Sequence, residues 1–379
     1  MSEHRRRRSS RRYRLVLAVV AAIAAVAFVV SLLVQPAEPD PLAQQSISLA
    51  QPTTPVPTTP PPPAPPPPVT IAFAGDVHFT DRTEGLLADP GTAFGPISSA
   101  LSAADIAMVN LETAITDRGV EEPKEFHFRA PPAALDALAA AGVDITTLAN
   151  NHAVDYGPLG LEDTLAAAAA SPIPIVGIGP DAATAYAPYR FQVRGIGISI
   201  FGVSQVPDRT YQRWTATDSG PGIATTEDQN RLIDGVAQAS AAGDVVVVYL
   251  HWGIERDACP TEEMTSLATD LAAAGADAIV GSHAHLLLGS GYLDMPGSTA
   301  YVSYGLGNFV WWRSDPEADN TGVLTLTVSN GMVTGAVMTP ALIDDTGRPQ
   351  PVLGPMAIEK VAAFEALRAC AGLVPTPAV

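Results

Sequence analysis

The chain has 379 residues, enough for one large domain or two ordinary ones, and 47% of its residues are apolar. The formal net charge is −18, and because residues 1–14 contribute about +6, the remainder carries about −24. Such an acidic chain argues against a nucleic-acid partner, and a polyanionic substrate would need local cations such as bound metal ions.

The N-terminal stretch predicts a membrane anchor behind a basic cytoplasmic tail, residues 1–14. Residues 15–34 are an uncharged run that is long enough, at about 1.5 Å per residue, to cross a hydrocarbon core of roughly 30 Å. The arginines before it predict a single-pass protein of the cell membrane with a cytoplasmic N-terminus and an extracellular main domain. A cleaved signal peptide is the alternative, although the apolar run is longer than is typical and residues 35–38 form a poor cleavage site.

A spacer is predicted after the anchor. Residues 35–68 are rich in proline and threonine, a composition that forms no core and favours a disordered, extended chain of about 3.1 Å per residue. The main domain is expected at residues 69–345, followed by a C-terminal extension at 346–379.

Strands and helices alternate through most of the main domain. Strands are expected at 69–74, 106–110, 143–148, 173–178, 191–203 (a hairpin), 245–250 and 276–280, with helices at 97–104, 131–141, 158–170, 227–242 and 261–274. Later strands are expected at 301–304, 322–328 and 332–339, the last two joined at Asn330-Gly331. This order indicates an α/β domain with more than one sheet.

The chain has two cysteines, Cys259 and Cys370, which are too few for a disulfide scaffold or a thiolate metal site. If the domain is exported, the two are expected to pair with each other. The alternative is that they are two unrelated small residues.

Polar residues suited to metal binding follow five of the expected strands. They are Asp76-Val77-His78, Asn110-Leu111-Glu112, Asn150-Asn151-His152, His251-Trp252-Gly253 and His283-Ala284-His285. Five of the seven histidines lie in these clusters. Because open α/β sheets gather their sites at the carboxyl ends of parallel strands, we expect the five clusters to converge.

The donor types match a centre of two divalent ions such as Mn, Zn or Fe. The first ion is expected to bind Asp76, His78 and His285. The second is expected to bind Asn151, His251 and His283. Glu112 is expected to bridge the two, because paired ions in such centres act together on the reacting oxygens.

His152, beside Asn151, is then free for general acid catalysis, and Asp155 is its expected orienter. Each motif alone has a structural alternative. Asp-x-His after a strand is commonly a turn, Glu112 can be a solvated carboxylate, and Asn150-Asn151 can form a tight turn. The ordered occurrence of all the motifs at strand ends favours the metal centre.

Six segments, in order, resemble the CapA family, which is associated with bacterial poly-γ-glutamate capsule synthesis. They are Gly75-Asp76-Val77, Asn110-Leu111-Glu112, residues 150–157, residues 251–255, residues 281–285 and residues 304–309. The resemblance spans about residues 69–340 and marks Asn150, Glu255 and Asn308 as further motif residues. CapA proteins are in turn similar to the calcineurin-like metallophosphoesterase superfamily, which implies an αββα sandwich of two packed sheets flanked by helices.

Four positions depart from the family pattern. His78 stands where a hydrophobic residue or methionine is usual and restores the Asp-x-His of metallophosphoesterases, whereas Glu112 occupies the place of a bridging aspartate. Arg256 replaces a tyrosine, and Ala284 replaces a proline between the two histidines. The first two differences bear on metal content and the last two on substrate details.

Together with the predicted anchor, the resemblance implies a membrane-anchored, extracytoplasmic protein of capsule or cell-surface polymer synthesis, which uses two divalent ions to hydrolyse a phosphoester or an amide. Its expected partners are an anionic polymer such as poly-γ-glutamate or a phosphoester substrate, the membrane through residues 15–34, and other capsule-synthesis membrane subunits. Two alternatives fit the same features: a non-catalytic subunit that binds and exports a polymer, and a secreted phosphoesterase or nucleotidase.

Overall fold

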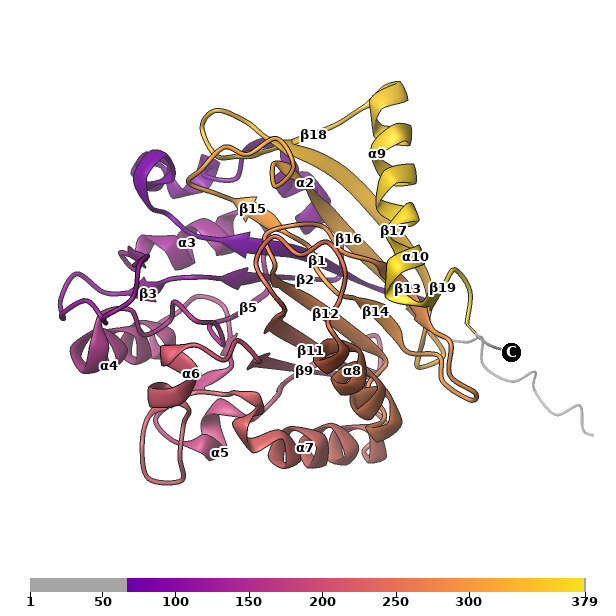
Figure 1. Cartoon of the computed structure of the whole chain (residues 1–379), viewed down its shortest axis with the longest axis horizontal. Coiled ribbons are helices and arrows are strands. Elements are labelled where there is room, and N and C mark those ends of the chain that lie inside the picture. Colours follow the sequence, from indigo (N-terminus) through magenta and orange to yellow (C-terminus); the bar gives the residue numbers. More distant parts are fainter. Residues whose placement is uncertain (1–66, 378–379) are drawn as a thin grey trace, which may run out of the picture. The chain divides into compact units, whose positions relative to one another are not determined.

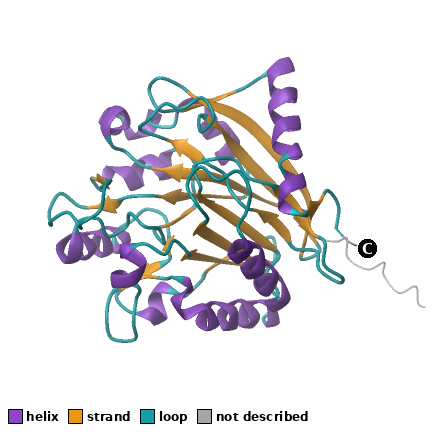
Figure 2. Ribbon diagram, viewed as in Figure 1, coloured by secondary structure: helices purple, strands orange, loops and turns teal. Residues whose placement is uncertain are grey.

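A computed structural model describes residues 67–377. The basic tail, the predicted anchor and nearly all of the proline-rich spacer lie outside the described residues. Within the described range, no helix combines the length and apolar character that a membrane crossing requires. Figures 1 and 2 show two β-sheets with helices on their outer faces.

The first sheet is mixed and has eight strands. Its parallel part consists of β1 (Val69–Val77), β2 (Ile106–Leu111), β5 (Ile145–Thr147) and β6 (Ile175–Val176). Its antiparallel part continues from β1 through β16 (Asn320–Ser329), β17 (Met332–Ile343) and β18 (Pro349–Pro351). The short strand β15 (Asn308–Val310) pairs in parallel with the end of β1.

The second sheet has seven strands, four of them parallel. The parallel strands are β9 (Ile196–Ser204), β11 (Val245–Trp252), β12 (Ala278–His283) and β14 (Tyr301–Ser303). Antiparallel strands complete its edges: β8 (Tyr189–Val193), β13 (Ser290–Leu293) and β19 (Leu373–Val374). Two small pairs stand apart, β3 (Ala114–Ile115) with β4 (Arg129–Ala130) and β7 (Ile178–Gly179) with β10 (Gly222–Ile223).

Three apolar layers hold these elements together. Between the sheets, Ile71 and Phe73 of β1 belong to one buried cluster with Val247 and Tyr249 of β11, and the Tyr249 hydroxyl donates to the Ala74 carbonyl across the interface at 2.8 Å. Helices that bury apolar side chains on the outer face of the first sheet are α2 (Ser98–Ser102), α3 (Ala133–Ala140) and α4 (Gly157–Ala169). Those on the second are α5 (Ala182–Ala185), α7 (Gln229–Ala241), α8 (Glu262–Ala274) and α10 (Arg368–Ala371). The α/β class with two sheets is therefore confirmed.

Most of the predicted elements are present, with shifted ends. The hairpin at Asn330-Gly331 is confirmed, because both residues have positive φ (54° and 78°) between β16 and β17, as a tight hairpin turn requires. The single strand predicted at 173–178 is wrong. Gly177 (φ 83°) breaks it into β6 and β7, which pair in different sheets.

The C-terminal stretch belongs to the packed fold. Its strand β18 extends the first sheet and β19 extends the second, while α9 (Gly354–Ala366) packs on β17. A disulfide joins Cys259, in the loop after β11, to Cys370 of α10, with 5.8 Å between the Cα atoms. The remaining short elements are α6 (Arg209–Trp214) and the 3₁₀ turns η1 (Asp81–Ala88), η2 (Pro90–Thr92), η3 (Gly95–Ile97) and η4 (Thr226–Asp228).

Candidate metal centre

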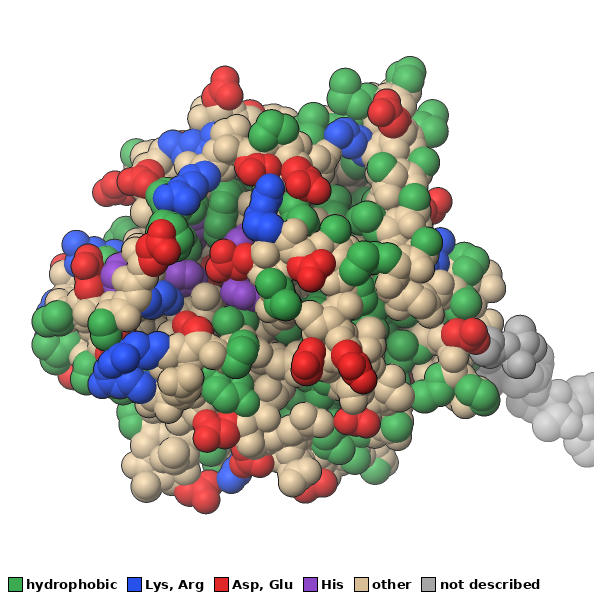
Figure 3. Space-filling view, in the orientation of Figure 1, with side chains coloured by type: hydrophobic (Ala, Val, Ile, Leu, Met, Phe, Trp, Pro, Cys, Tyr) green, Lys and Arg blue, Asp and Glu red, His purple; other side chains and the backbone are tan. Residues whose placement is uncertain are grey.

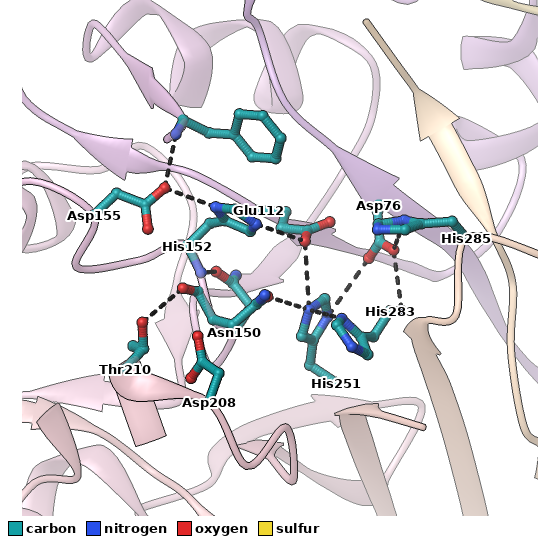
Figure 4. Close-up of polar contacts among 12 residues, drawn as sticks. Asp76, Glu112, Asn150, His152, Asp155, Asp208, Thr210, His251, His283 and His285 are labelled. Atoms are coloured by element: carbon teal, nitrogen blue, oxygen red, sulfur yellow. Dashed lines mark hydrogen bonds and ion pairs between the residues drawn. The ribbon is translucent and has the colours of Figure 1, made fainter. Parts of the chain in front are cut away.

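The carboxyl ends of β1, β2, β11 and β12 meet at one edge of the two sheets (Figures 1 and 4). The close approach depends on Gly75, because a Cβ atom there would overlap the carbonyl oxygen of Gly307, in the loop that leads to Asn308. Asn308 is paired in register with Asp76. The loop before β15 therefore closes directly over the end of β1.

Three overlapping groups of side chains have metal-ligating atoms within 4.8 Å of one another among the described residues. They are Glu112–His251–His283, Asp76–Glu112–His285 and Glu255–His283–His285. Asn151 adjoins the first group, because its Oδ1 lies 2.9 Å from His251 Nε2. Glu112 is shared by the first two groups, the position expected of a carboxylate between two ions.

The structure places His78 outside these groups. Its ring is fully buried, stacked on Phe128 at 4.2 Å between centroids and edge-on to Trp311 at 4.4 Å. Neither ring nitrogen has a hydrogen-bond partner among the described residues. The backbone carries His78 past the edge where Asp76 sits, into an aromatic cluster that also packs against His152 and His285.

The environment of Glu112 indicates whether the site suits a cation. It is 0% exposed, and neither carboxylate oxygen has a hydrogen-bond partner within the described part of the chain. The Nε2 atoms of His251 and His152 lie 3.5 Å and 3.7 Å from its Oε1. Burial raises the pKa of Glu112 well above its ordinary value, and the nearby Asp76 charge adds to this. Because a buried carboxylate without a partner is costly, the residues present fit a divalent cation.

Asp76 has an ordered environment. Its Oδ1 accepts a hydrogen bond from Asn110 Nδ2 at 2.7 Å, and its Oδ2 accepts one from the His283 backbone N–H at 3.0 Å. Burial alone would raise the pKa of Asp76, but the imidazoles of His285 and His251 outweigh it and hold the pKa below its usual value. Asp76 is therefore an ionised oxygen donor.

The two histidines at the end of β12 lie on a strained stretch of backbone. His283 has φ 96° and His285 has φ 58°, the left-handed region that residues other than glycine rarely adopt. His283 Nδ1 lies 3.1 Å from His251 Nε2, and His285 Nδ1 lies 2.9 Å from Asn308 Oδ1. Such strain is concentrated at functional sites, and here it accompanies the two imidazoles at the cluster of donors (Figure 4).

His152 and Asp155 form a pair at the edge of this cluster. Asp155 Oδ2 accepts from His152 Nδ1 at 2.7 Å and from the Phe128 backbone N–H at 2.7 Å, so the other ring nitrogen, Nε2, faces Glu112 (Figure 4). Burial raises the pKa of Asp155 to about 6, with Lys124 opposing the shift. Asn150 orders the turn, because its Oδ1 accepts from the His152 N–H and its Nδ2 donates to Asn110.

Two residues of this network lie outside the sequence-based set of site residues. Lys124 Nζ lies 2.8 Å from Asp155 Oδ1 and donates to the Asn151 carbonyl at 2.6 Å. Lys124 is one of only two lysines in the chain, and this rarity is the one feature of the sequence that could have marked it as a site residue. Asn110 Nδ2, which donates to Asp76, also lies 3.1 Å from His251 Nδ1. The sequence marks Asn110 only as a member of the Asn110-Leu111-Glu112 motif, and its contacts with Asp76 and His251 become visible only in the folded structure.

Comparisons with known proteins agree with these motifs. The family model described as bacterial capsule synthesis protein PGA_cap matches residues 70–311. The chain is 30% identical over 259 residues to the PGA biosynthesis protein CapA of Bacillus subtilis (strain 168), covering 66% of each protein. It is 28% identical over 267 residues to the capsule biosynthesis protein CapA of Bacillus anthracis, covering 66% of this chain and 62% of that protein. The chain thus spans slightly less than two thirds of the length of these relatives.

Among solved structures, a phosphatase from Mycoplasma pneumoniae is similar over 78% of this chain and 97% of its own, with 13% identity and a TM-score of 0.43. At this identity and TM-score the likeness is distant. The match at residues 70–311 is different, because it covers well over half of the 379 residues. The chain belongs to the bacterial capsule synthesis protein family PGA_cap, the family of the CapA proteins.

Proposed function

We propose that this chain is a metal-dependent hydrolase of capsule or cell-surface polymer synthesis. The observation that carries the proposal is the Glu112 carboxylate, which is fully buried, has no hydrogen-bond partner among the described residues and is shared by two donor groups. In this proposal Asp76, Glu112 and His285 hold one divalent ion. Glu112, Asn151, His251 and His283 hold a second.

The donor set favours Mn, Zn or Fe, because it mixes imidazoles with carboxylate and amide oxygens and contains no thiolate. When bound, such ions act as Lewis acids on a phosphoryl or carbonyl oxygen and offset the negative charge that develops there.

The chain's own residues supply proton transfer and water exclusion. His152 gives or takes a proton at Nε2, while Asp155 holds Nδ1 and so fixes the ring orientation. Phe128 stacks on His152 at 4.2 Å, and Trp311 packs against His285 at 4.5 Å. These two aromatic side chains form an apolar wall that limits the access of bulk water to the candidate donors.

The proposed substrate is an anionic polymer of the poly-γ-glutamate kind, joined by amide bonds, or a phosphoester. Support comes from the family and from the names of the relatives, which refer to PGA and capsule biosynthesis. Bound cations would offset the negative charge of a domain that is itself acidic. We also propose a membrane anchor at residues 15–34, a main domain outside the cytoplasm, and other membrane subunits as partners. The sequence pattern and the family resemblance support these three parts of the proposal.

The test combines metal analysis of the purified chain with hydrolysis assays on poly-γ-glutamate and on small phosphoesters. We expect the wild type to retain divalent metal and to hydrolyse the polymer, and His283→Ala to lose both properties. His127→Ala is the matched control, because His127 lies outside all three donor groups. Stoichiometric metal without any hydrolysis would remove the enzyme assignment in favour of a polymer-binding subunit. Rapid turnover of small phosphate esters alone would favour a phosphoesterase.

A further inference from the structure

Most candidate ligands of the metal centre are closed off from solvent, and His285 is partly exposed, with 14% of its side chain accessible. Asp76, Glu112 and His251 are 0% exposed, and His283 is 4% exposed. Glu255, a member of the third donor group, is exposed. Among the donor groups found in residues 67–377 it is the only exposed member, so its carboxylate is the most accessible donor for an ion that would arrive from solvent.

The third donor group overlaps both of the buried ones. Glu255 forms this group with His283 and His285. His283 is also a member of the Glu112–His251 group, and His285 is also a member of the Asp76–Glu112 group. A neutral imidazole offers a single lone pair. An ion held by Glu255 and the two histidines therefore competes with the inner ions for the same ligands, and it can pass from the outer position to either inner one by exchanging only some of its ligands.

The neighbours of Glu255 fix its place. The backbone N–H of Arg256 donates to the carbonyl of Ala284, the residue between the two histidines, at 2.9 Å. Its guanidinium lies 3.0 Å from Asp315 and 3.5 Å from Glu317. Arg256 has φ 67°, a second strained backbone position that faces the strained end of β12. The Arg256–Ala284 hydrogen bond therefore holds the loop that carries Glu255 against the segment that carries the two histidines. Figure 3 shows histidine side chains at the surface of the molecule, among acidic and basic groups.

We propose that Glu255, His283 and His285 form an outer cation position through which divalent metal ions load into the buried centre. The inference rests on the proposed metal centre and adds a route of entry to it. In this role Glu255 sets the rate of metal uptake and is not a permanent ligand of the loaded centre.

The experiment measures uptake of Co²⁺ by the metal-free full-length chain in a stopped-flow spectrometer, with the visible absorption of bound Co²⁺ as the readout. We expect Glu255→Gln to slow loading by about tenfold or more without changing the final amount of Co²⁺ bound. Glu317→Gln is the matched control, because it removes one negative charge from the same rim at a residue outside the donor groups. Its loading rate is expected to equal that of the wild type.

Three results would overturn the inference: Glu255→Gln loads as fast as the wild type, Glu317→Gln slows loading as much as Glu255→Gln does, or Glu255→Gln binds less Co²⁺ than the wild type at equilibrium. The last result would make Glu255 a permanent ligand. A wild-type chain that binds no Co²⁺ is a separate outcome, which removes the metal centre and the proposed function with it.

Discussion

Lys124 is the residue that links the His152–Asp155 pair to the turn bearing Asn151. Its ammonium lies 2.8 Å from Asp155 Oδ1 and 2.6 Å from the Asn151 carbonyl, and its side chain is 13% exposed. Asp155 is 0% exposed, so removing this cation leaves a buried carboxylate without its charge partner. The ammonium is therefore a positioning group for two parts of the site.

We expect Lys124→Met to lower the free energy of unfolding by about 1–3 kcal/mol, because a buried charged group loses its partner. Its metal affinity is expected to fall by about tenfold, as when other groups behind metal ligands are removed. Denaturant unfolding and calorimetric metal titration measure the two effects. Arg118→Met is the control, because Arg118 pairs with Asp163 at the surface of the molecule, where ion pairs contribute little. Equal metal affinity in Lys124→Met and the wild type would contradict the positioning role.

At the scale of elements, the site depends on how closely the loop before β15 approaches β1. The position of Gly75 leaves no room for a Cβ atom beside the Gly307 carbonyl, so Gly75→Ala forces this loop away from β1. We expect a loss of about 1–3 kcal/mol in unfolding free energy, as for other overpacked sites, together with weaker metal binding because Asn308 moves away from His285. Gly85→Ala is the control, because nothing lies within 4 Å of a Cβ atom there. Normal stability of Gly75→Ala would show that the loop moves freely.

Asp277, just before β12, links the start of this strand to β11. Its Oδ2 accepts the Val246 N–H at 2.9 Å, and burial raises its pKa to about 6 from the usual 3.8. Because the folded-state pKa is the higher one, the stabilising contribution is complete below pH 3.8 and is lost as the pH rises through about 6. We expect Asp277→Asn to flatten this fall in unfolding free energy, measured by denaturant unfolding at a series of pH values. An unchanged pH profile would contradict the assignment.

The order of strands and the clustering of polar residues at their ends could be predicted from the sequence, because buried β-branched runs and the motifs that follow them are local signals. Because sites in open α/β sheets lie at the carboxyl ends of the parallel strands, Asp76, Glu112 and His283 could also be predicted to lie at one edge. Whether His78 joins them depends on the rings of Phe128 and Trp311, which come from distant loops. Strands as short as β18 and β19 have no pattern of their own and exist only through pairing with β17 and β13.

At the scale of the whole molecule, the disulfide connects the loop beside the candidate metal centre to the C-terminal end of the fold. Cys259 lies four residues after Glu255, and Cys370 lies in α10, three residues before the first residue of β19. The bond closes a loop with a sequence separation of 111 residues, which includes all the strands from β12 to β18. It therefore restricts the unfolded chain over about a third of the described residues.

In the chain-entropy model, closing a loop of about this length stabilises a folded protein by roughly 4–5 kcal/mol, and measured values are commonly about 2–4 kcal/mol. We expect the double variant Cys259→Ser with Cys370→Ser to lose stability within this range, measured by denaturant unfolding under oxidising conditions. Reduction of the wild type should reproduce the loss, whereas the double variant should not respond to a reductant. Because the loop carrying Glu255 is also held by the backbone bond from Arg256 to Ala284, metal binding at equilibrium should survive in the double variant. A loss of metal together with the disulfide would mean that the covalent link, and not the local backbone contact, holds this side of the centre in place.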